Sequence, residues 1–545
     1  MVSGQRKIST DKSSYGMVST ASGKATEAGV AILEAGGNAV DAAVAAALCL
    51  GVSEPQASGI GGQSMGLVYL REEDRVFAVD GSSRAPFHIQ PTRLGSRPMK
   101  LGLKSSTVPS TPSMLGVLHE RYGRLPLKEV MLPAIRTALD GFRLSSLQSR
   151  LLKDHADALR GDSLIETRYF REGHPAEAGT IIRQPELADT LETMAHSGWQ
   201  AFYTGDIGRQ ITRDMQSRGG LITEMDLAQI PMPIERDPLG GSYRGLRVYT
   251  FPPPGAGRVL IQLLNILEEF PPELLNPEEP AGALIYALAF RFALNDRKKM
   301  PVHPDYYSEA ANQMMTEKGY GQELAKRIER IGTYVMGEGF TAPPTSGETT
   351  HLSVMDRQGN AVGITQSVEL VFGSKAMADQ LGFFYNNYMS AFEYEDMTHP
   401  YFLLPGGKPW SSVAPTLLFQ NGDPLLLLGS PGSERISTSL AQVITRVVDH
   451  HLSLEEAIAA PRFHASGNGT LLIELKRFSS DVIDVLEQSR FVVKKRGAYS
   501  FYLGCVQGVQ APAPGETQYI GVADPRRDGR AKGPKTIMKE EGGEQ

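Results

Sequence analysis

Apolar positions follow a helical spacing through the middle of the chain and a strand-like pattern towards both ends. From residue 111 to residue 329, apolar residues recur every three or four positions, which is the period of an amphipathic helix. The segments with this spacing, each predicted to be a helix, are residues 112–121, 127–139, 184–196, 199–216, 259–270 and 281–296. The middle of the chain is therefore predicted to be mostly helical.

Short β-like runs separated by turn residues predict hairpins outside this region. The predicted hairpins pair residues 67–70 with 76–79, residues 352–354 with 361–371, and residues 416–419 with 425–428. The last of them turns at Asn421-Gly-Asp423, a combination common in tight β-turns. Further strands are predicted at residues 17–20, 245–251, 382–385, 471–475 and 491–494.

Two helices near the N-terminus are rich in alanine. The first is capped by Thr20 or Ser22 and ends at Leu33, before a pair of glycines, and the second covers residues 40–50. We predict that their small side chains let both helices pack closely against a sheet. Two more helices are predicted in the C-terminal part, at residues 436–450 and 454–459.

The most linker-like segment of the chain is residues 337–347. It is rich in Pro, Gly and hydroxyl residues, as exposed loops are, and we place the main boundary of the chain there. The next residues, Thr349 and Thr350, lead into the predicted hairpin of residues 352–371. Taken alone, Thr349 is an ordinary β-branched residue at the start of a strand.

The composition is that of a globular protein without a strongly charged surface. The 545 residues carry a formal net charge of −6, and this balance argues against binding to nucleic acid or to anionic membranes. No apolar segment follows the N-terminus, and the longest apolar run, residues 42–52, is too short to span a bilayer. We therefore expect a cytoplasmic protein. The basic residues near the C-terminus are expected to form a solvated tail: Arg526, Arg527, Arg530, Lys532 and Lys535.

Neither the cysteines nor the Gly-rich loop indicates a cofactor. Cys49 and Cys505 lie in no metal or redox spacing and are expected to be structural. The Gly-rich loop of residues 57–66 lacks both the dinucleotide pattern and a phosphate-loop lysine, so close backbone packing is its expected use. We expect no metal and no organic cofactor.

Three motifs change the interpretation of Thr349. Thr349-Thr-His-Leu-Ser353, Pro409-Trp-Ser-Ser-Val-Ala-Pro-Thr416 and Gly429-Ser-Pro-Gly-Ser-Glu-Arg-Ile436 together resemble the γ-glutamyltranspeptidase family of N-terminal-nucleophile hydrolases. The resemblance covers nearly the whole chain. Shorter motifs in the family's order carry it through the N-terminal part: Gly59-Ile-Gly-Gly62, Gln184-Pro-Glu-Leu-Ala188, Ala201-Phe-Tyr-Thr-Gly205, Thr223-Glu-Met-Asp-Leu227, Pro252-Pro-Pro254, Leu264-Asn-Ile-Leu267 and Asp296-Arg297.

The resemblance implies an α+β fold, a four-layer αββα sandwich, and a proenzyme that cuts itself between Glu348 and Thr349. The products would be a large subunit, 1–348, and a small subunit, 349–545, interleaved as a heterodimer or as a dimer of heterodimers. A threonine hydroxyl needs a nearby base to act as a nucleophile. Cleavage would free the α-amine of Thr349, whose reference pKa of about 8 suits that task.

The resemblance also implies roles for five other residues. The backbone N–H groups of Gly432 and Ser433 match the family's oxyanion hole, and Ser367 matches a hydroxyl residue that supports the nucleophile. Ser411 and Ser412 match the pair that binds the substrate α-carboxylate. His351 lies close to Thr349 in sequence, but we expect it to be structural because the α-amine already supplies a base.

The residues that would recognise a glutamyl head depart from the family pattern. Ala391 replaces the acidic residue that binds the substrate ammonium, Tyr388 stands where the family often has Gln or Glu, and Glu369 replaces an Asn. Ser82 stands where the family has its carboxylate-binding arginine, and Arg84, two positions later, is the candidate substitute. The segment 387–410, where the family has a lid, is short.

These departures leave three functions open. The first is a self-processed glutathione hydrolase or γ-glutamyltransferase that passes an acyl group to water or to an amine acceptor, with Glu369 replacing the missing acid. The second is an amidohydrolase or acylase for a non-glutamyl acyl amide, as in oxamate amidohydrolases and cephalosporin acylases. The third is an unprocessed, inactive family member with a binding role.

Overall fold

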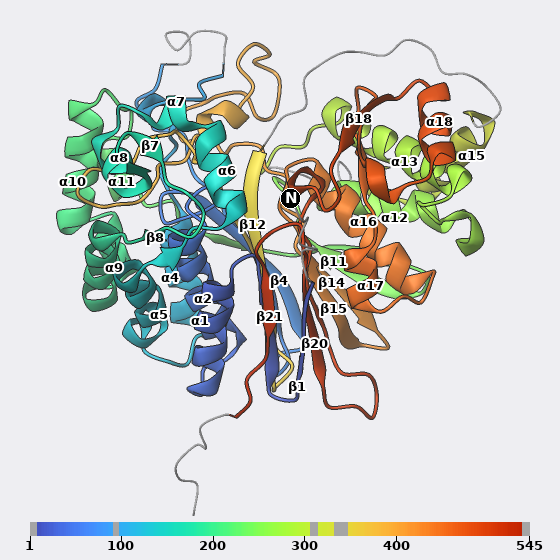
Figure 1. Ribbon diagram of the computed structural model, residues 1–545, viewed down its shortest axis with the longest axis horizontal. Helices are drawn as coiled ribbons and strands as arrows, with labels where there is room; N and C mark the ends of the chain where they lie inside the picture. Colours follow the sequence, from blue (N-terminus) through green and yellow to red (C-terminus); the bar gives the residue numbers. More distant parts are fainter. Residues whose placement is uncertain (1–7, 91–97, 306–313, 332–346, 537–545) are drawn as a thin grey trace, which may run out of the picture.

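The structure is a computed structural model that describes residues 8–90, 98–305, 314–331 and 347–536. Two antiparallel sheets lie face to face in its centre, and helices cover the outer side of each one (Figure 1). This arrangement confirms the predicted α+β sandwich of four layers. No helix in the described ranges is long and apolar enough to cross a membrane.

Each sheet has seven strands, and we call them sheet I and sheet II. Sheet I consists, in spatial order, of β1 (Ser9–Ser13), β20 (Tyr519–Ala523), β19 (Gln507–Gln510), β15 (Asp423–Gly429), β14 (Thr416–Gln420), β11 (Leu246–Thr250) and β10 (Leu239–Tyr243). Sheet II consists of β21 (Arg530–Lys532), β2 (Gly16–Thr20), β12 (Gly347–Asp356), β13 (Ala361–Leu370), β3 (Gln63–Leu70), β4 (Arg75–Gly81) and β9 (Ile234–Arg236).

Two groups of helices form the outer layers (Figure 1). Beside sheet II lie α1 (Gly23–Glu34), α2 (Ala39–Ser53), α4 (Thr111–Tyr122), α5 (Leu127–Asp140), α9 (Pro185–Ser197), α10 (Gly205–Ser217) and α11 (Glu224–Ala228). Beside sheet I lie α12 (Gly257–Glu268), α13 (Pro280–Lys299), α15 (Lys318–Ile331), α16 (Arg435–Val448), α17 (Leu454–Ala459) and α18 (Ser480–Gln488).

Smaller elements complete the fold. A lobe above sheet II contains α6 (Ser146–Asp154), α7 (Ala156–Leu159), α8 (Ser163–Tyr169), β5 (Phe142–Arg143), β6 (Phe170–Arg171), β7 (His174–Pro175) and β8 (Ile181–Ile182). A small third sheet near α18 contains β16 (Phe463–Ala465), β17 (Thr470–Glu474) and β18 (Val492–Arg496). The short 3₁₀ helices are η1 (Leu103–Ser105), η2 (Trp199–Phe202), η3 (Pro272–Leu274), η4 (Tyr388–Ala391), η5 (Leu475–Arg477) and η6 (Phe501–Leu503).

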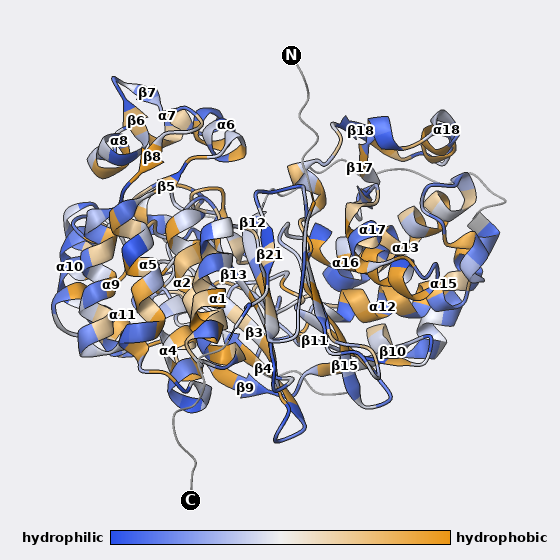
Figure 2. Cartoon of the chain, turned by 60° about the horizontal axis from the view of Figure 1, so that its bottom comes forward, coloured by the Kyte–Doolittle hydropathy of each residue, from blue (hydrophilic) through white to orange (hydrophobic). Residues whose placement is uncertain are grey.

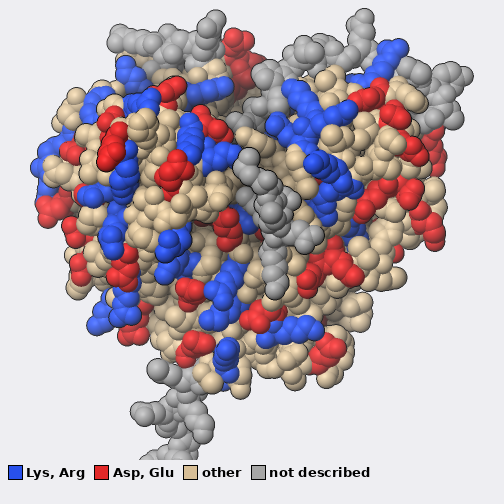
Figure 3. All heavy atoms as spheres, in the orientation of Figure 1, with Lys and Arg blue, Asp and Glu red and all other residues tan. Residues whose placement is uncertain are grey.

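The apolar residues pack in three layers that follow this architecture. Met65, Leu67, Leu417 and Leu427 belong to the cluster between the two sheets. Separate clusters fill the space between each sheet and its helices. Helix α2 is buried along nearly its whole length, as its alanines predicted, and α12 is largely hydrophobic (Figure 2). Lysines and arginines are interspersed with acidic residues on the face drawn in Figure 3.

The chain segments before and after Thr349 are interleaved in both sheets. In sheet II, β12 and β13 lie between β2 and β3, which come from the N-terminal part of the chain. In sheet I, β14 pairs with β11 in the same way. Separating residues 1–348 from residues 349–545 would therefore break continuous ladders. Of the predicted boundary segment, all but Gly347 lies outside the described residues.

The predicted hairpins and Ala-rich helices are confirmed, and three predictions are wrong. Residues 199–216 form η2 and then α10, because Gly205 adopts a φ of +79° that a continuous helix does not accommodate. Residues 382–385 form only an isolated bridge between Met377 and Phe384. Arg526 and Arg527 are buried rather than solvated, because each pairs with buried carboxylates.

Candidate active site

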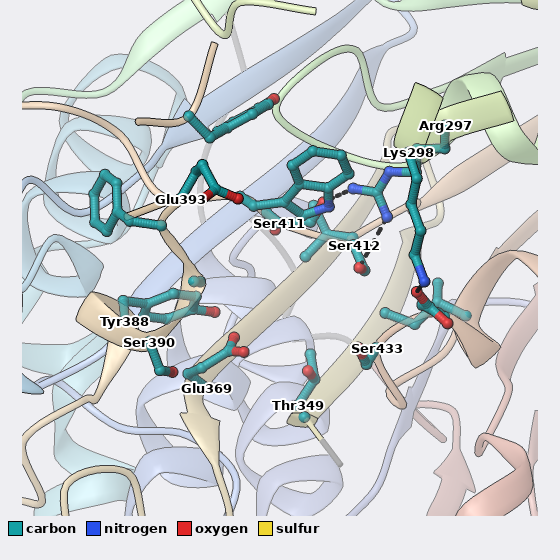
Figure 4. Close-up of a pocket in the computed structure, with 18 of the residues that line it drawn as sticks. Arg297, Lys298, Thr349, Glu369, Tyr388, Ser390, Glu393, Ser411, Ser412 and Ser433 are labelled. Atoms are coloured by element: carbon teal, nitrogen blue, oxygen red, sulfur yellow. Dashed lines mark hydrogen bonds and ion pairs between the residues drawn. The ribbon is translucent and has the colours of Figure 1, made fainter. Parts of the chain in front are cut away.

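A cavity of about 300 Å³ opens beside the first residues of β12. Six of the predicted site residues line it: Thr349, Glu369, Tyr388, Ser411, Ser412 and Ser433. Glu369 and Tyr388 point into the cavity from one side, and Ser412, with Arg297 behind it, from the other (Figure 4). The structure therefore gathers residues from four distant parts of the chain around Thr349.

Thr349 lies at an irregularity of the ladder between β12 and β13. Glu348 is opposite Glu369 and Thr350 is opposite Gln366, so Thr349 faces two residues of β13, and a β-bulge on that strand falls opposite Thr349. Glu369, on the facing strand, has a φ of +80°, a left-handed conformation that is rare for residues other than glycine. The bulge takes Thr349 out of the regular pairing and lets its side chain reach the cavity.

Ser367 contacts the peptide bond that precedes Thr349. Its Oγ donates a hydrogen bond to the carbonyl oxygen of Glu348 over 2.5 Å, and it accepts one from the N–H of Glu369 over 2.8 Å. The predicted supporting hydroxyl thus lies, in the continuous chain, on the Glu348 carbonyl. Close packing of the Gly-rich loop holds this strand in place, since a Cβ on Gly62 would lie only 2.3 Å from the Ser367 carbonyl oxygen.

The turn that carries Gly432 and Ser433 comes just before α16. Gly432 has a φ of +122° and Ser433 a φ of +55°. The carbonyl groups of these two residues accept hydrogen bonds from the first N–H groups around the start of α16, at 3.1 and 3.0 Å. Their own N–H groups have no acceptor among the residues that the structure describes. Two free N–H groups at a helix N-terminus suit a developing negative charge.

Arg297, at the end of α13, is a site residue that was not predicted from the sequence. Its guanidinium donates to the Ser412 Oγ over 3.0 Å and also to the Ser411 carbonyl. The ring of Trp410 lies 4.6 Å from the guanidinium carbon and fixes its position. Within the described ranges, no carboxylate forms an ion pair with Arg297, and burial lowers its pKa to about 10. Its only signal in the sequence was the motif Asp296-Arg297.

Arg84, the predicted carboxylate ligand, does not line the cavity. Its backbone pairs with Val108, and its guanidinium donates to the Gly406 carbonyl over 3.3 Å. It also lies 3.7 Å from the carboxylate of Asp305. These contacts hold the Arg84 side chain at another position, and Arg297 supplies the cation in the cavity wall instead.

Glu369 is an acid that has no partner in the described part of the chain. No described side chain donates a hydrogen bond to its carboxylate, and burial raises its pKa to about 7. Burial, together with the charge of Glu369, also raises the pKa of the Tyr388 phenol. Ala391 lines the same wall without a polar group. No acid therefore enters the cavity from position 391, while the carboxyl group of Glu369 enters it from β13.

His351 lies between the two sheets, outside the cavity. Its ring nitrogens contact the hydroxyls of Thr365 and Ser353 at 2.8 and 3.1 Å. Burial lowers its pKa to about 3, so the ring is neutral at physiological pH. A Cβ on Gly429 would overlap the ring at 2.1 Å. The expected structural role of this histidine fits these contacts.

On the other side of Thr349, a cluster of buried charges surrounds the backbone. Arg527 donates to the Thr349 carbonyl over 2.8 Å and pairs with the Glu348 carboxylate. Glu54 accepts a hydrogen bond from the Thr350 hydroxyl over 2.6 Å. Burial raises the pKa of Glu54 to about 7, although the charge of Arg527 opposes this shift. No local pattern in the sequence predicts this cluster, because its members lie far apart along the chain.

Three comparisons with known proteins agree with one another. The family profile described as "Gamma-glutamyltranspeptidase" matches residues 25–533. The "Glutathione hydrolase proenzyme" of Escherichia coli (strain K12) is 34% identical over 538 residues, covering 94% of this chain and 91% of that protein. The "Acylase ACY 1 proenzyme" of Pseudomonas sp. (strain SE83) is 34% identical over 482 residues, covering 85% and 84%. A crystal structure of cephalosporin acylase from Bacillus halodurans superimposes with a TM-score of 0.86 at 27% identity, covering 98% of both chains.

Proposed function

This chain belongs to the γ-glutamyltranspeptidase family of enzymes, and we propose that it is a threonine amide hydrolase and acyltransferase that releases its own nucleophile. The observation that carries this proposal is the position of Thr349. It lies on one cavity with the turn at Ser433 and the pair Ser411–Ser412, and the Glu348 carbonyl just before it already holds a hydrogen bond from Ser367.

Self-cleavage requires attack on the preceding peptide bond. The Thr349 Oγ adds to the Glu348 carbonyl carbon, and the Ser367 hydroxyl stabilises the resulting oxyanion. The C–N bond then breaks, and the hydroxyl proton ends on the departing Thr349 nitrogen, which leaves an ester between Glu348 and the Thr349 Oγ. Water hydrolyses this ester into the Glu348 carboxylate and the free hydroxyl and α-amine of Thr349.

Turnover uses the same hydroxyl with the new amine as its base. The Thr349 Oγ attacks the amide carbonyl of the substrate, and its proton passes to the α-amine and then to the leaving amine. The N–H groups of Gly432 and Ser433 receive the oxyanion, where the loss of one donor raises the barrier by about 3 kcal/mol. Water or an acceptor amine then releases the acyl group from Thr349.

Among the charged residues that line the cavity, Lys298 pairs with Glu434 and Glu393 accepts hydrogen bonds from backbone N–H groups. The other two, Arg297 and Glu369, have neither kind of charge partner in the described part of the chain, and they indicate the acyl donor. Ser412 accepts a hydrogen bond from Arg297, so its own proton is available for a substrate carboxylate backed by the Arg297 cation. Across the cavity, the Glu369 carboxylate can pair with an ammonium group. A zwitterionic amino-acid head satisfies both groups, so a γ-glutamyl amide such as glutathione is the proposed donor.

A second acyl donor is favoured by Ala391 and by the protonation of Glu369. Because the pKa of Glu369 is raised to about 7, half of this group is neutral near that pH and needs no ammonium partner. The amide of a simple dicarboxylic acid, such as a glutaryl amide, would still place its free carboxylate at Ser412 and Arg297. Such a substrate would match the relatives named as acylases.

The mass of the purified protein tests the proposal. We expect two fragments, residues 1–348 and 349–545, and an N-terminal threonine on the smaller one. Thr349→Ala should remain a single chain of 59.2 kDa without amidase activity, because the nucleophile is absent. A wild-type chain that stays whole would support an inactive binding protein, and a Thr349→Ala chain that splits at the same bond would remove Thr349 from the mechanism.

A further inference from the structure

Arg527 contacts both sides of one peptide bond. It belongs to the segment between β20 and β21 and is only 5% exposed. One guanidinium nitrogen donates to the Thr349 carbonyl over 2.8 Å, and the other pairs with the carboxylate of Glu348. The ring of Phe501 lies 4.8 Å from the guanidinium carbon and limits its movement. The planar guanidinium, held in this position, therefore binds one group on each side of the Glu348–Thr349 peptide bond.

Other side chains hold the neighbouring atoms of the same segment. Ser367 binds the Glu348 carbonyl, and Glu54 binds the Thr350 hydroxyl and lies 3.8 Å from the Arg527 guanidinium. The β-bulge has removed the ladder partner that Thr349 would otherwise have. Glu348 and Thr350 keep their ladder partners, so side chains and the flanking pairs together set the orientation of this peptide bond.

Orientation matters because self-cleavage is an intramolecular attack by a weak nucleophile. The hydroxyl and the carbonyl belong to adjacent residues, and they react only when the peptide plane presents its carbon to the Thr349 Oγ. A geometry held close to the reactive one raises the rate of such reactions by several orders of magnitude. Contacts that fix the carbonyl groups on both sides of the bond supply this restraint.

We propose that Arg527 is a positioning residue for self-cleavage, and that its salt bridge with Glu348 presents the Glu348–Thr349 bond to the Thr349 hydroxyl. This inference rests on the proposed self-cleavage and goes beyond it. Arg527 does not touch the attacked carbonyl oxygen, which Ser367 holds, so it acts through the Glu348 side chain and the Thr349 carbonyl.

The rate of self-cleavage in freshly produced protein, followed by mass spectrometry, tests the inference. We expect Arg527→Gln to slow splitting about 100-fold and Glu348→Gln to slow it about tenfold. The double variant should be no slower than Arg527→Gln alone, because both changes break one contact. Arg527→Lys, which keeps the charge, should recover part of the rate. A purely structural role would give neither this coupling nor this rescue.

Arg530→Gln is the matched control. Arg530 lies three residues further along, at the start of β21, and forms an exposed ion pair with Glu27. Its loss should therefore leave the rate of splitting unchanged. Each variant is also made with Thr349→Ala, and its thermal unfolding shows whether the uncut chain folds. If Arg527→Gln does not fold, Glu348→Gln and Arg527→Lys decide the matter, since both keep the size and polarity of the site.

The possible failures are distinguishable. Wild-type protein that does not split, or Thr349→Ala protein that does, would overturn the proposed function itself. Wild-type protein that splits while Arg527→Gln and Glu348→Gln split at the same rate would overturn only the role of Arg527. Rate losses of the two single variants that multiply in the double variant would show that they do not act through one contact, which also contradicts the inference.

Discussion

Buried charged residues lie on two sides of Thr349. Those on one side form ion pairs with each other, and those on the other side do not. On one side, which we call the clamp side, Arg527 pairs with Glu348 and lies close to Glu54. On the cavity side, Arg297 and Glu369 have no oppositely charged partner among the described residues. All five groups have lost most of their contact with water, so burial acts against the charged form of each.

We infer that the paired charges stabilise the fold, whereas the unpaired charges serve to bind a ligand. A buried ion pair compensates for much of the desolvation of its members, whereas a lone buried charge destabilises the fold. The clamp side can therefore hold the backbone rigidly without a ligand. The cavity side keeps a destabilising arrangement that only a bound molecule with complementary charges relieves. Charges without partners that face a cavity thus indicate the chemistry of the substrate.

The largest expected effect comes from breaking the clamp side. Arg527→Met, made with Thr349→Ala so that all chains remain uncut, should lower the free energy of unfolding by about 3–5 kcal/mol, because it leaves two carboxyl groups buried without their cation. Urea denaturation measures this loss. Arg530→Gln, which removes an exposed pair, should change the same quantity by less than about 0.5 kcal/mol. Equal midpoints for the two variants would show that the clamp contributes no more than a surface pair.

The next effect concerns the cation of the cavity side. Arg297→Met should lower kcat/KM for a γ-glutamyl anilide about 100-fold, equivalent to about 2.7 kcal/mol, because the substrate carboxylate loses its charged partner. Because Arg297 is a buried charge without an ion pair, its replacement should not lower the free energy of unfolding as Arg527→Met does. Steady-state kinetics and urea denaturation of the same preparations provide both numbers. A large loss of stability with unchanged kcat/KM would place Arg297 among the structural charges.

A smaller effect, opposite in sign, is expected for the acid of the cavity side. The fold raises the pKa of Glu369 to about 7, so the folded protein favours the protonated form, and this favourable contribution is lost as the pH rises through that value. Glu369→Gln stays neutral at every pH. The variant should therefore be more stable than the wild type by about 2 kcal/mol at pH 8 and equally stable at pH 4. Unfolding midpoints at the two pH values test this, and a destabilised variant at pH 8 would mean that Glu369 already has a partner.

The features that the sequence predicted are those that local patterns encode. The hairpin that contains Thr349 has a turn at residues 356–360 between apolar runs, and α2 carries its alanines at helical spacing; both elements formed as predicted. The short motifs predicted four site residues that line one cavity: Thr349, Ser411, Ser412 and Ser433. These positions follow from neighbouring residues or from a shared family pattern.

The features that the sequence analysis missed depend on partners far away in the chain. Arg527 belongs to a basic run typical of a solvated tail, and its partner Glu348 precedes it by 179 residues. The motif beside Arg84 predicted that this arginine binds the substrate carboxylate in the cavity. The cavity is instead lined by Arg297, at the end of α13. Residues 382–385 have the composition of a strand, yet within the described ranges they pair only through the bridge between Met377 and Phe384. Charge and spacing alone do not reveal which distant group will meet a side chain.

The most direct measurement compares two substrates that differ only in the ammonium group, L-γ-glutamyl-4-nitroanilide and glutaryl-4-nitroanilide, in the wild type and in Glu369→Gln at pH 8. If the cavity side is built for a zwitterionic head, the wild type should prefer the γ-glutamyl compound at least tenfold in kcat/KM, and Glu369→Gln should lose most of this preference. A wild type that prefers the glutaryl compound, or a preference that Glu369→Gln leaves unchanged, would contradict the account.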